Sequence, residues 1–235
     1  MESKENFSKV KKSKFAKMEI WHGANNLFLI KSGNKILKNK IKELIKKNKT
    51  DGLILVNILS KRYIDMKFYN PDGSIDNCGN GLRVAAKYCY DKKYVKKQGK
   101  IFSFKQNFEY FIKDNVTIIF DNIKKEKNLW NIGGVLHKVY RVKSIKNSRE
   151  KAIKLREKYD ANITLIREVN NKTFAQTFER GVENFTYSCG TGAIAASLFT
   201  KKEEIFMPGG LLKIKNKNNK ILLIGNAVKI KNVEK

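Results

Sequence analysis

The feature of this sequence that most limits its fold is an internal repeat. Cys78-Gly-Asn-Gly-Leu-Arg-Val-Ala85 and Cys189-Gly-Thr-Gly-Ala-Ile-Ala-Ala196 share the pattern C-G-x-G-x-x-x-A, and their cysteines lie 111 residues apart. Each copy opens a segment with helical periodicity and follows a polar stretch. The repeat therefore predicts two similar α/β halves, each with a cysteine at the N-terminus of a helix.

The remaining pattern agrees with a mixed α/β, or α+β, chain that has many strands and few helices. Short apolar or alternating segments predict strands that include residues 28–30, 52–56, 63–69, 101–104, 116–120 and 162–166. Helical periodicity predicts an amphipathic helix at 36–45 and a charged helix at 148–158, besides the two helices after the cysteines. We predict halves at 14–122 and 123–224, a terminal strand at 225–235 that returns to the first half, and a flexible basic tail at 1–13.

A cysteine at a helix N-terminus carries specific chemistry. Free backbone N–H groups and the positive end of the helix dipole bind anions there and lower the pKa of a thiol. Two such sites that face each other would hold a carboxylate, with one sulfur on either side of the adjacent carbon. This arrangement predicts inversion at that carbon, with one thiolate as general base and one thiol as general acid. A single C-G-x-G turn is more often structural, but its duplication favours a function, whereas Cys89 is interpreted as a buried apolar filler.

The composition excludes several other classes of protein. An apolar content of 41% over 235 residues is enough for one large core or two smaller ones. No apolar run is long enough for a signal peptide or a membrane span, and three cysteines are too few for a secreted disulfide framework. His22 and His137 belong to no metal-ligand pattern. We therefore expect a cytoplasmic protein with reduced thiols and without a metal or a membrane partner.

The net charge of +28 leaves a different class open, because a strongly basic protein can bind nucleic acid. Only seven of the 50 basic residues are arginine, the residue that nucleic-acid readers use most for bidentate contacts. Lysine, asparagine and isoleucine are all abundant, which is also typical of a strongly AT-biased genome. We interpret the charge as background composition and expect no specific nucleic-acid partner, with a basic nucleic-acid-binding protein as the alternative.

The segments around the two cysteines resemble the active-site motifs of the diaminopimelate epimerase family. The first motif is similar to Asn70-Pro-Asp-Gly-Ser-Ile-Asp-Asn-Cys78-Gly-Asn-Gly-Leu-Arg83, and the second to Glu179-Arg-Gly-Val-Glu-Asn-Phe-Thr-Tyr-Ser-Cys189-Gly-Thr-Gly192. Shorter matches extend over the chain at His22–Phe28, Asp51-Gly52, Asn162-Ile163, Met207–Gly210 and Ile224–Ala227. The resemblance implies a cofactor-independent amino-acid epimerase with two pseudo-symmetric domains. Each would be a mostly antiparallel or mixed sheet wrapped around a central helix, with the small-molecule substrate in the cleft between them, and a homodimer is compatible with it.

The resemblance also implies a role for each matching residue, with Cys78 and Cys189 as the acid/base pair. Arg180 would bind a distal carboxylate of the substrate, helped by the amides of two asparagines. Alternatively, Asn70 is only a turn residue and Arg180 only a surface ion-pair partner of Glu179. The predicted substrate-binding residues are Asn26, Asn70, Gly79, Asn80, Asn162, Glu179, Arg180, Gly190 and Thr191.

Departures from the family pattern at Leu27, Val135 and Phe185 bear on the choice of substrate. Val135 stands where a substrate-facing asparagine is expected. Conversion of LL-diaminopimelate to meso-diaminopimelate, a precursor of lysine and peptidoglycan, is the favoured reaction. The alternative is a racemase of histidine, lysine or a lanthionine-like substrate on the same scaffold. Gly190–Ala195 also fits a loose dinucleotide fingerprint, but no βαβ unit surrounds it, which argues against a Rossmann oxidoreductase.

Overall fold

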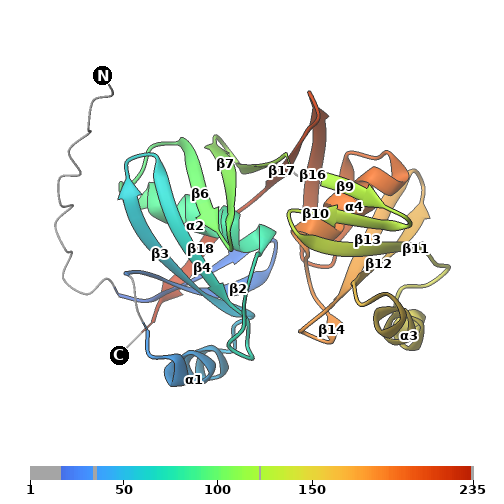
Figure 1. Ribbon diagram of the computed structural model, residues 1–235, viewed down its shortest axis with the longest axis horizontal. Coiled ribbons are helices and arrows are strands. Elements are labelled where there is room, and N and C mark those ends of the chain that lie inside the picture. Colours follow the sequence, from blue (N-terminus) through green and yellow to red (C-terminus); the bar gives the residue numbers. More distant parts are fainter. Residues whose placement is uncertain (1–16, 34–35, 122, 234–235) are drawn as a thin grey trace.

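The structure, a computed structural model, describes residues 17–33, 36–121 and 123–233. These residues form the mixed α+β fold that the sequence predicts: one hydrogen-bonded sheet of 18 strands curls around two central helices (Figure 1). The predicted basic tail at 1–13 lies outside the described residues. None of the helices in the described part of the chain has the length and apolar character that a membrane crossing requires.

The N-terminal half contains eight strands and two helices. In chain order they are β1 (Glu19–Gly23), β2 (Asn26–Ser32), α1 (Lys38–Asn48), β3 (Gly52–Ser60), β4 (Tyr63–Tyr69), β5 (Ile75–Asp76), α2 (Gly79–Asp91), β6 (Gln98–Ser103), β7 (Gln106–Ile112) and β8 (Val116–Phe120). Helix α1 connects the parallel strands β2 and β3, and α2 connects the parallel strands β4 and β6, while the other pairs are antiparallel.

The C-terminal half repeats this plan. Its elements are β9 (Ile123–Glu126), β10 (Leu129–Ile132), β11 (Val135–Arg141), the 3-10 turn η1 (Lys146–Ser148), α3 (Arg149–Tyr159), β12 (Asn162–Val169), β13 (Lys172–Glu179), β14 (Asn184–Phe185), α4 (Gly190–Thr200), β15 (Glu204–Met207), β16 (Gly210–Lys217) and β17 (Lys220–Gly225). Helix α3 connects the parallel strands β11 and β12, and α4 connects the parallel strands β13 and β15. The duplication predicted from eight residues therefore extends to the order and pairing of the elements.

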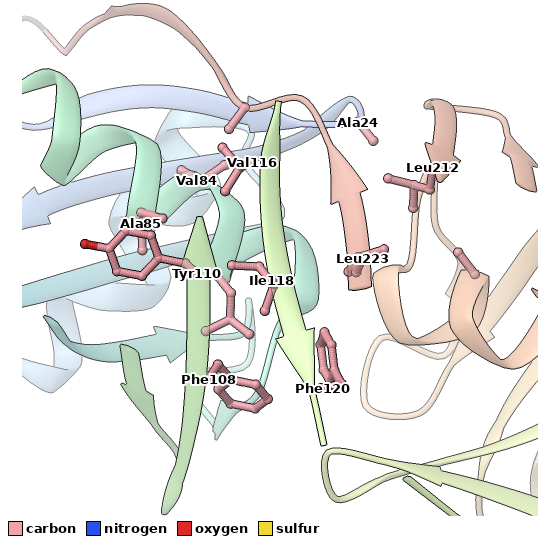
Figure 2. Packing of buried hydrophobic residues seen from close by; sticks show 14 of the residues in the cluster. Ala24, Val84, Ala85, Phe108, Tyr110, Val116, Ile118, Phe120, Leu212 and Leu223 are labelled. Atoms are coloured by element: carbon pink, nitrogen blue, oxygen red, sulfur yellow. The ribbon is translucent and has the colours of Figure 1, made fainter. Parts of the chain in front are cut away.

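The last two strands join the halves into one sheet. Strand β17 pairs with β16 on one side and with β8 of the N-terminal half on the other, and β18 (Val228–Asn232) pairs with β1. Figure 2 shows Ile118 of β8 and Leu223 of β17, which are partners across these two strands. The main apolar cluster contains residues of both halves, so the core runs across the junction. The division at residues 122 and 123 stays a prediction.

Helices α2 and α4 occupy the centres of the two halves, whereas α1 and α3 lie outside (Figure 1). Nearly every residue of the first two turns of α2 and α4 is buried. A helix buried on all sides needs small or apolar residues throughout, which the Ala-Ile-Ala-Ala run 193–196 provides. Cys89 of α2 is fully buried in the main cluster, which confirms its interpretation as an apolar filler.

A buried carboxylate connects the strands β1 and β18 to the end of α2. Glu19 of β1 is only 2% exposed and accepts hydrogen bonds from Trp21 Nε1 at 2.8 Å, Lys92 Nζ at 2.5 Å and Lys229 Nζ at 3.0 Å. Burial alone would raise the pKa of Glu19, but the bonds from Lys92, Trp21 and Lys229 outweigh it and lower that pKa. Glu19 thus joins β1, the C-terminal end of α2 and β18.

We expect Glu19→Gln to lower the free energy of unfolding by about 2–3 kcal/mol, because it removes charge-assisted hydrogen bonds from a buried site. Because the folded carboxyl has a lowered pKa, the difference from wild type should shrink as the pH falls through that pKa. Urea unfolding at several pH values measures both effects. The control is Glu109→Gln, whose exposed pair with Lys220 should contribute less than about 1 kcal/mol. Equal losses in the two variants would contradict the role of Glu19.

Candidate active site

The two cysteines of the repeat occupy equivalent positions in the structure. Cys78 and Cys189 are the N-cap residues of α2 and α4, with φ and ψ of −133° and 108° in the first and −133° and 112° in the second. Each sulfur accepts a hydrogen bond from the backbone N–H three residues on, at 3.3 Å from Gly81 and 3.4 Å from Gly192. The thiol stands where a serine or aspartate oxygen usually caps a helix. The predicted position of both cysteines at helix N-termini is confirmed.

The two helices meet end to end. A Cβ atom added to Gly190 would lie 3.3 Å from the Cα of Gly79 and 2.8 Å from Leu223 Cδ2. A side chain at position 190 would therefore force Leu223 or the facing helix to shift, whereas a Cβ atom on Gly79 would lie 3.4 Å from the Cα of Gly190, an ordinary contact, so the close approach requires the glycine at position 190. The positive ends of two helix dipoles are therefore brought to one place.

Both helix N-termini open into a cavity of about 470 Å³ that the two halves line together. Cys78 is partly exposed, whereas Cys189 is 7% exposed. Every residue predicted for the site lines this cavity: Asn26, Asn70, Cys78, Gly79, Asn80, Asn162, Glu179, Arg180, Cys189, Gly190 and Thr191. The tertiary structure thus gathers residues that are spread over 166 positions of the sequence, from 26 to 191. Their individual roles in binding stay predictions.

A network of amides crosses the boundary between the halves. Asn80 Nδ2 donates to Asn26 Oδ1 at 2.6 Å and to the carbonyl of Ser188 at 3.0 Å, and Asn26 Nδ2 donates to Asp51 Oδ2 at 3.1 Å. Asp51 also accepts from the backbone N–H of Leu27. Asp51 and Ser188 were not predicted as site residues. The Asp51-Gly52 match was the signal for the first, while no pattern pointed to a backbone carbonyl.

Asn162 and Arg180 line the cavity from the C-terminal half. Asn162 Oδ1 accepts a hydrogen bond from the backbone N–H of Arg180 at 2.7 Å, and Arg180 Nη1 contacts Asp160 Oδ2 at 2.9 Å. The alternative in which Arg180 pairs with Glu179 is therefore wrong, because the Glu179 carboxylate turns inward and accepts from Thr186 Oγ1 at 2.7 Å. Asn70 does close a turn, and it lines the cavity as well.

His137 contacts the lining residue Thr191 from outside the cavity, a role that the sequence did not predict. It is fully buried, with Nε2 at 2.9 Å from Thr191 Oγ1 and Nδ1 at 3.2 Å from Thr164 Oγ1. Thr191 Oγ1 lies 3.5 Å from Cys189 Sγ. Burial lowers the pKa of His137 to about 3, so the ring is neutral and can donate through one nitrogen and accept through the other. His137 thereby orients Thr191 beside Cys189.

The expectation that the helix N-termini make the thiols acidic needs correction. Burial raises the pKa of Cys78 to about 12, and the Gly81 N–H only partly opposes this. Burial also raises the pKa of Cys189, and the charge of Glu179 adds to the effect. Loss of solvation thus outweighs the helix dipole at both sulfurs, and both thiols are protonated near neutral pH.

Only one of the three departures from the family pattern concerns the cavity. Val135 lines it, but Leu27 points to the opposite face of β2 from Asn26 and packs near α1. Phe185 packs edge-to-face on Phe178 in the cluster beneath α3. Leu27 and Phe185 thus do not line the cavity, and their bearing on substrate choice stays a prediction. Among the described residues, no group of three or more His, Cys, Asp and Glu could hold a metal ion.

Comparison with known proteins gives relatives over most of the chain, although no family model matches it. The chain is 29% identical over 223 residues to a diaminopimelate epimerase of Thermotoga maritima, covering 86% of this chain and 94% of that protein. It is 32% identical over 202 residues to a diaminopimelate epimerase of Nitratiruptor sp., covering 77% and 80%. The solved structure of a putative phenazine biosynthesis PhzC/PhzF protein from Clostridium difficile shares the fold, with a TM-score of 0.69 at 14% identity over 93% of this chain and 99% of that one.

The neutral, buried state of His137 predicts an acid-sensitive fold. The unfolded chain takes up a proton on this histidine below about pH 6.5, whereas the folded protein does so only near its lowered pKa of about 3. Between these values stability falls on acidification, by about 1.4 kcal/mol per pH unit from this group. We expect His137→Gln to lose that share of the pH dependence. Urea unfolding between about pH 7 and 4 tests this, and parallel stability curves for the two proteins would contradict it.

Proposed function

The chain belongs to the diaminopimelate epimerase family and is an isomerase, and from this premise we propose that it inverts the α-carbon of an amino acid between Cys78 and Cys189. Epimerisation of LL-diaminopimelate to meso-diaminopimelate is the proposed reaction. The observation that carries this proposal is the pair of cysteine-capped helices that meet end to end in one cavity. With this activity the enzyme would supply precursors of lysine and peptidoglycan in the cytoplasm.

The α-carboxylate of the substrate would bind between the two helix N-termini. Backbone N–H groups at Gly79-Asn80 and Gly190-Thr191 are available there, because the first N–H groups of a helix have no partner within it. When the α-proton leaves, negative charge spreads from the carbon into this carboxylate. The fixed dipoles of α2 and α4 are already oriented to stabilise that charge, so little reorganisation accompanies the reaction.

The proton transfer would then use one sulfur on each face of the α-carbon. A thiolate takes the α-proton and becomes a thiol, while the electron pair of the broken C–H bond remains on the carbon and its carboxylate. The opposite thiol gives its proton to the other face and becomes a thiolate. The atoms and charges balance, and the two cysteines have exchanged their protonation states at the end of a turnover.

Glu179 couples the formation of the thiolate to the binding of the substrate. Its carboxylate raises the pKa of both thiols through its charge. It is partly buried beside Cys189, and loss of solvation raises its own pKa. We propose that the α-ammonium of the substrate pairs with Glu179. The pair would neutralise the charge that disfavours a thiolate, so the base would form when an amino acid binds.

The charged residues that line the cavity also support a substrate with two charges at its distal end. Arg180 is the basic residue of the lining, and Asp51, Asp76, Asp160 and Glu179 are its acids. The distal carboxylate of diaminopimelate would share Arg180 with Asp160, and its distal ammonium would find a carboxylate at Asp51 or Asp76. Glu179 remains for the ammonium at the reacting carbon.

Val135 favours a second candidate on the same scaffold. This apolar side chain lines the cavity where the family resemblance implies an asparagine. A site that lacks one donor to a charged group loses about 1.5–3 kcal/mol of binding. An amino acid without a distal carboxylate, such as lysine or histidine, would be affected less, whereas a lanthionine-like compound carries a distal carboxylate as diaminopimelate does. The two candidates share the chemistry at the α-carbon and differ in the distal group.

We expect Cys78→Ala and Cys189→Ala each to lower turnover by on the order of 10²–10⁴-fold, because each removes the acid or base for one face. In deuterated water, early wild-type product should carry deuterium at the α-carbon while the remaining substrate does not. Proton NMR follows both. The matched control is Cys89→Ala, which removes a core thiol outside the cavity and should keep the turnover of wild type. Near-normal turnover by either cavity variant would rule out the two-base mechanism.

We expect Val135→Asn to raise kcat/KM for diaminopimelate by about ten- to a hundredfold, because it restores a neutral donor near a charged group. Val135→Ala is the control, since it changes the volume without adding a donor. Initial rates with diaminopimelate, lanthionine, lysine and histidine measure the effect. If the asparagine variant is no better with diaminopimelate and wild type turns over an amino acid without a distal carboxylate, the second candidate replaces the first.

A further inference from the structure

Arg83 of α2 is a buried cation without an acidic partner. Its side chain is fully buried, with 0% exposure, and it lies five positions after Cys78. The guanidinium donates to Asn80 Oδ1 at 2.8 Å and, at 3.5 Å each, to the carbonyls of Gly79 and Asn226. All three acceptors are neutral, and no ion pair in the described part of the chain includes Arg83. A buried charge without a counter-ion is strongly unfavourable, so the presence of the Arg83 guanidinium in this site needs a physical explanation.

The chain builds a close-fitting site for this guanidinium. A Cβ atom on Gly225 would lie 3.0 Å from Arg83 Nε, and one on Gly23 would lie 3.6 Å from Arg83 Nη2. Asn226 Oδ1 accepts from the backbone N–H of Ala24 at 3.0 Å and so joins the two segments that flank Arg83. These two segments, at 22–28 and 224–227, match the family pattern. Apart from Asn26, their residues have no role in the proposed proton transfer.

Arg83 also breaks the symmetry of the repeat. The residue of α4 that corresponds to Arg83 is Ile194, which is fully buried and uncharged. The two cysteines therefore have nearly the same backbone geometry, but the helix that Cys78 caps carries a buried charge five residues on and the helix that Cys189 caps does not. A cation in a dry site stabilises a nearby anion much more than it would in water.

The groups that face the two sulfurs have opposite effects. At Cys78 the charge of Glu179 from β13 raises the pKa, and the smaller effect of Arg83 from α2 lowers it. At Cys189, Glu179 raises the pKa both through its charge and through a hydrogen bond, and the groups that oppose it are the hydrogen-bonding partners Thr191 and the Gly192 N–H, neither of them a cation. Asp76 of β5 lines the same cavity at an exposed position, where water screens its charge. The balance of charge therefore favours a thiolate at Cys78 over one at Cys189.

We propose that Arg83 is the buried counter-ion of the Cys78 thiolate, so that Cys78 is the thiol that loses its proton first and acts as the base when an amino acid binds, while Cys189 stays protonated and acts as the acid. This inference rests on the proposed function, in which the two thiols exchange protons with the substrate. Arg83 is a positioning residue as well, because it occupies Asn80 Oδ1 and leaves Asn80 Nδ2 to bond Asn26 and Ser188 across the halves. Its charge makes the two halves of the repeat chemically unequal.

The test compares Arg83→Met, which keeps the length of the side chain without its charge, with Arg83→Lys and with wild type. Alkylation by iodoacetamide across a range of pH, followed by peptide mass spectrometry, gives separate rates for Cys78 and Cys189. We expect the Cys78 rate near pH 8 to fall about tenfold in Arg83→Met, which corresponds to a pKa higher by about one. The Cys189 rate should stay within about twofold of wild type, and Arg83→Lys should restore most of the Cys78 rate.

Lys87→Met is the matched control, because Lys87 lies one turn further along α2 in a surface pair with Asp91. It removes the same charge from the same helix, and the profile of Cys78 should not change. The proposal is overturned if Arg83→Met is folded by circular dichroism and its Cys78 profile matches wild type, or if Lys87→Met shifts that profile equally.

A second measurement keeps the proposal testable if Arg83→Met does not fold. Thiolate absorbance in the ultraviolet gives the titration of Cys78 in Cys189→Ala and of Cys189 in Cys78→Ala. We expect Cys78 to titrate about one pH unit or more below Cys189, and the reverse order would refute the assignment. Neither readout uses an amino-acid substrate. Normal racemisation by Cys78→Ala would therefore overturn the proposed function without affecting these measurements.

Discussion

The contact of two helix N-termini at Gly79 and Gly190 is the constraint on which the rest of the structure depends. Because the two glycines touch, α2 and α4 must sit at the centres of their own halves and approach each other end to end. Strand β17 holds this arrangement by pairing with both β16 and β8, so the halves share one sheet and one core. The cavity between them is a consequence of that junction.

The same contact places the ionisable groups of the site under two opposing influences. Two helix dipoles favour anions at this point, yet burial raises the pKa of both thiols and of Glu179. Desolvation and the dipoles thus act in opposite directions, and desolvation is the larger effect. A charged group brought in by the substrate can reverse the balance, and the buried Arg83 already biases it toward Cys78. A symmetric backbone with unequal charges suits two groups that must hold opposite protonation states while a proton is transferred.

Local patterns predicted the elements well where neighbouring residues decide the structure. The helix predicted at 148–158 is α3 at 149–159, and the strand predicted at 116–120 is β8 with the same bounds. The candidate site was also predictable, because its residues fall within a few short motifs. The acidity of the thiols was predicted wrongly, since the helix dipole is visible in a local pattern whereas the depth of burial is set by strands far away in the chain.

The sequence by itself determined the duplication, the two cysteine-capped helices and the family resemblance, because each depends on residues that lie close together along the chain. Only the tertiary structure decided that Asp51, Ser188 and His137 join the site, since strand pairing and helix packing bring them there from separate elements. It likewise turned Leu27 and Phe185 away from the cavity, because successive residues of a strand face opposite sides of the sheet, and it left Val135 in the lining. That Arg83 forms no ion pair within the described residues is also a result of packing, which a sequence with 22 acidic residues does not reveal.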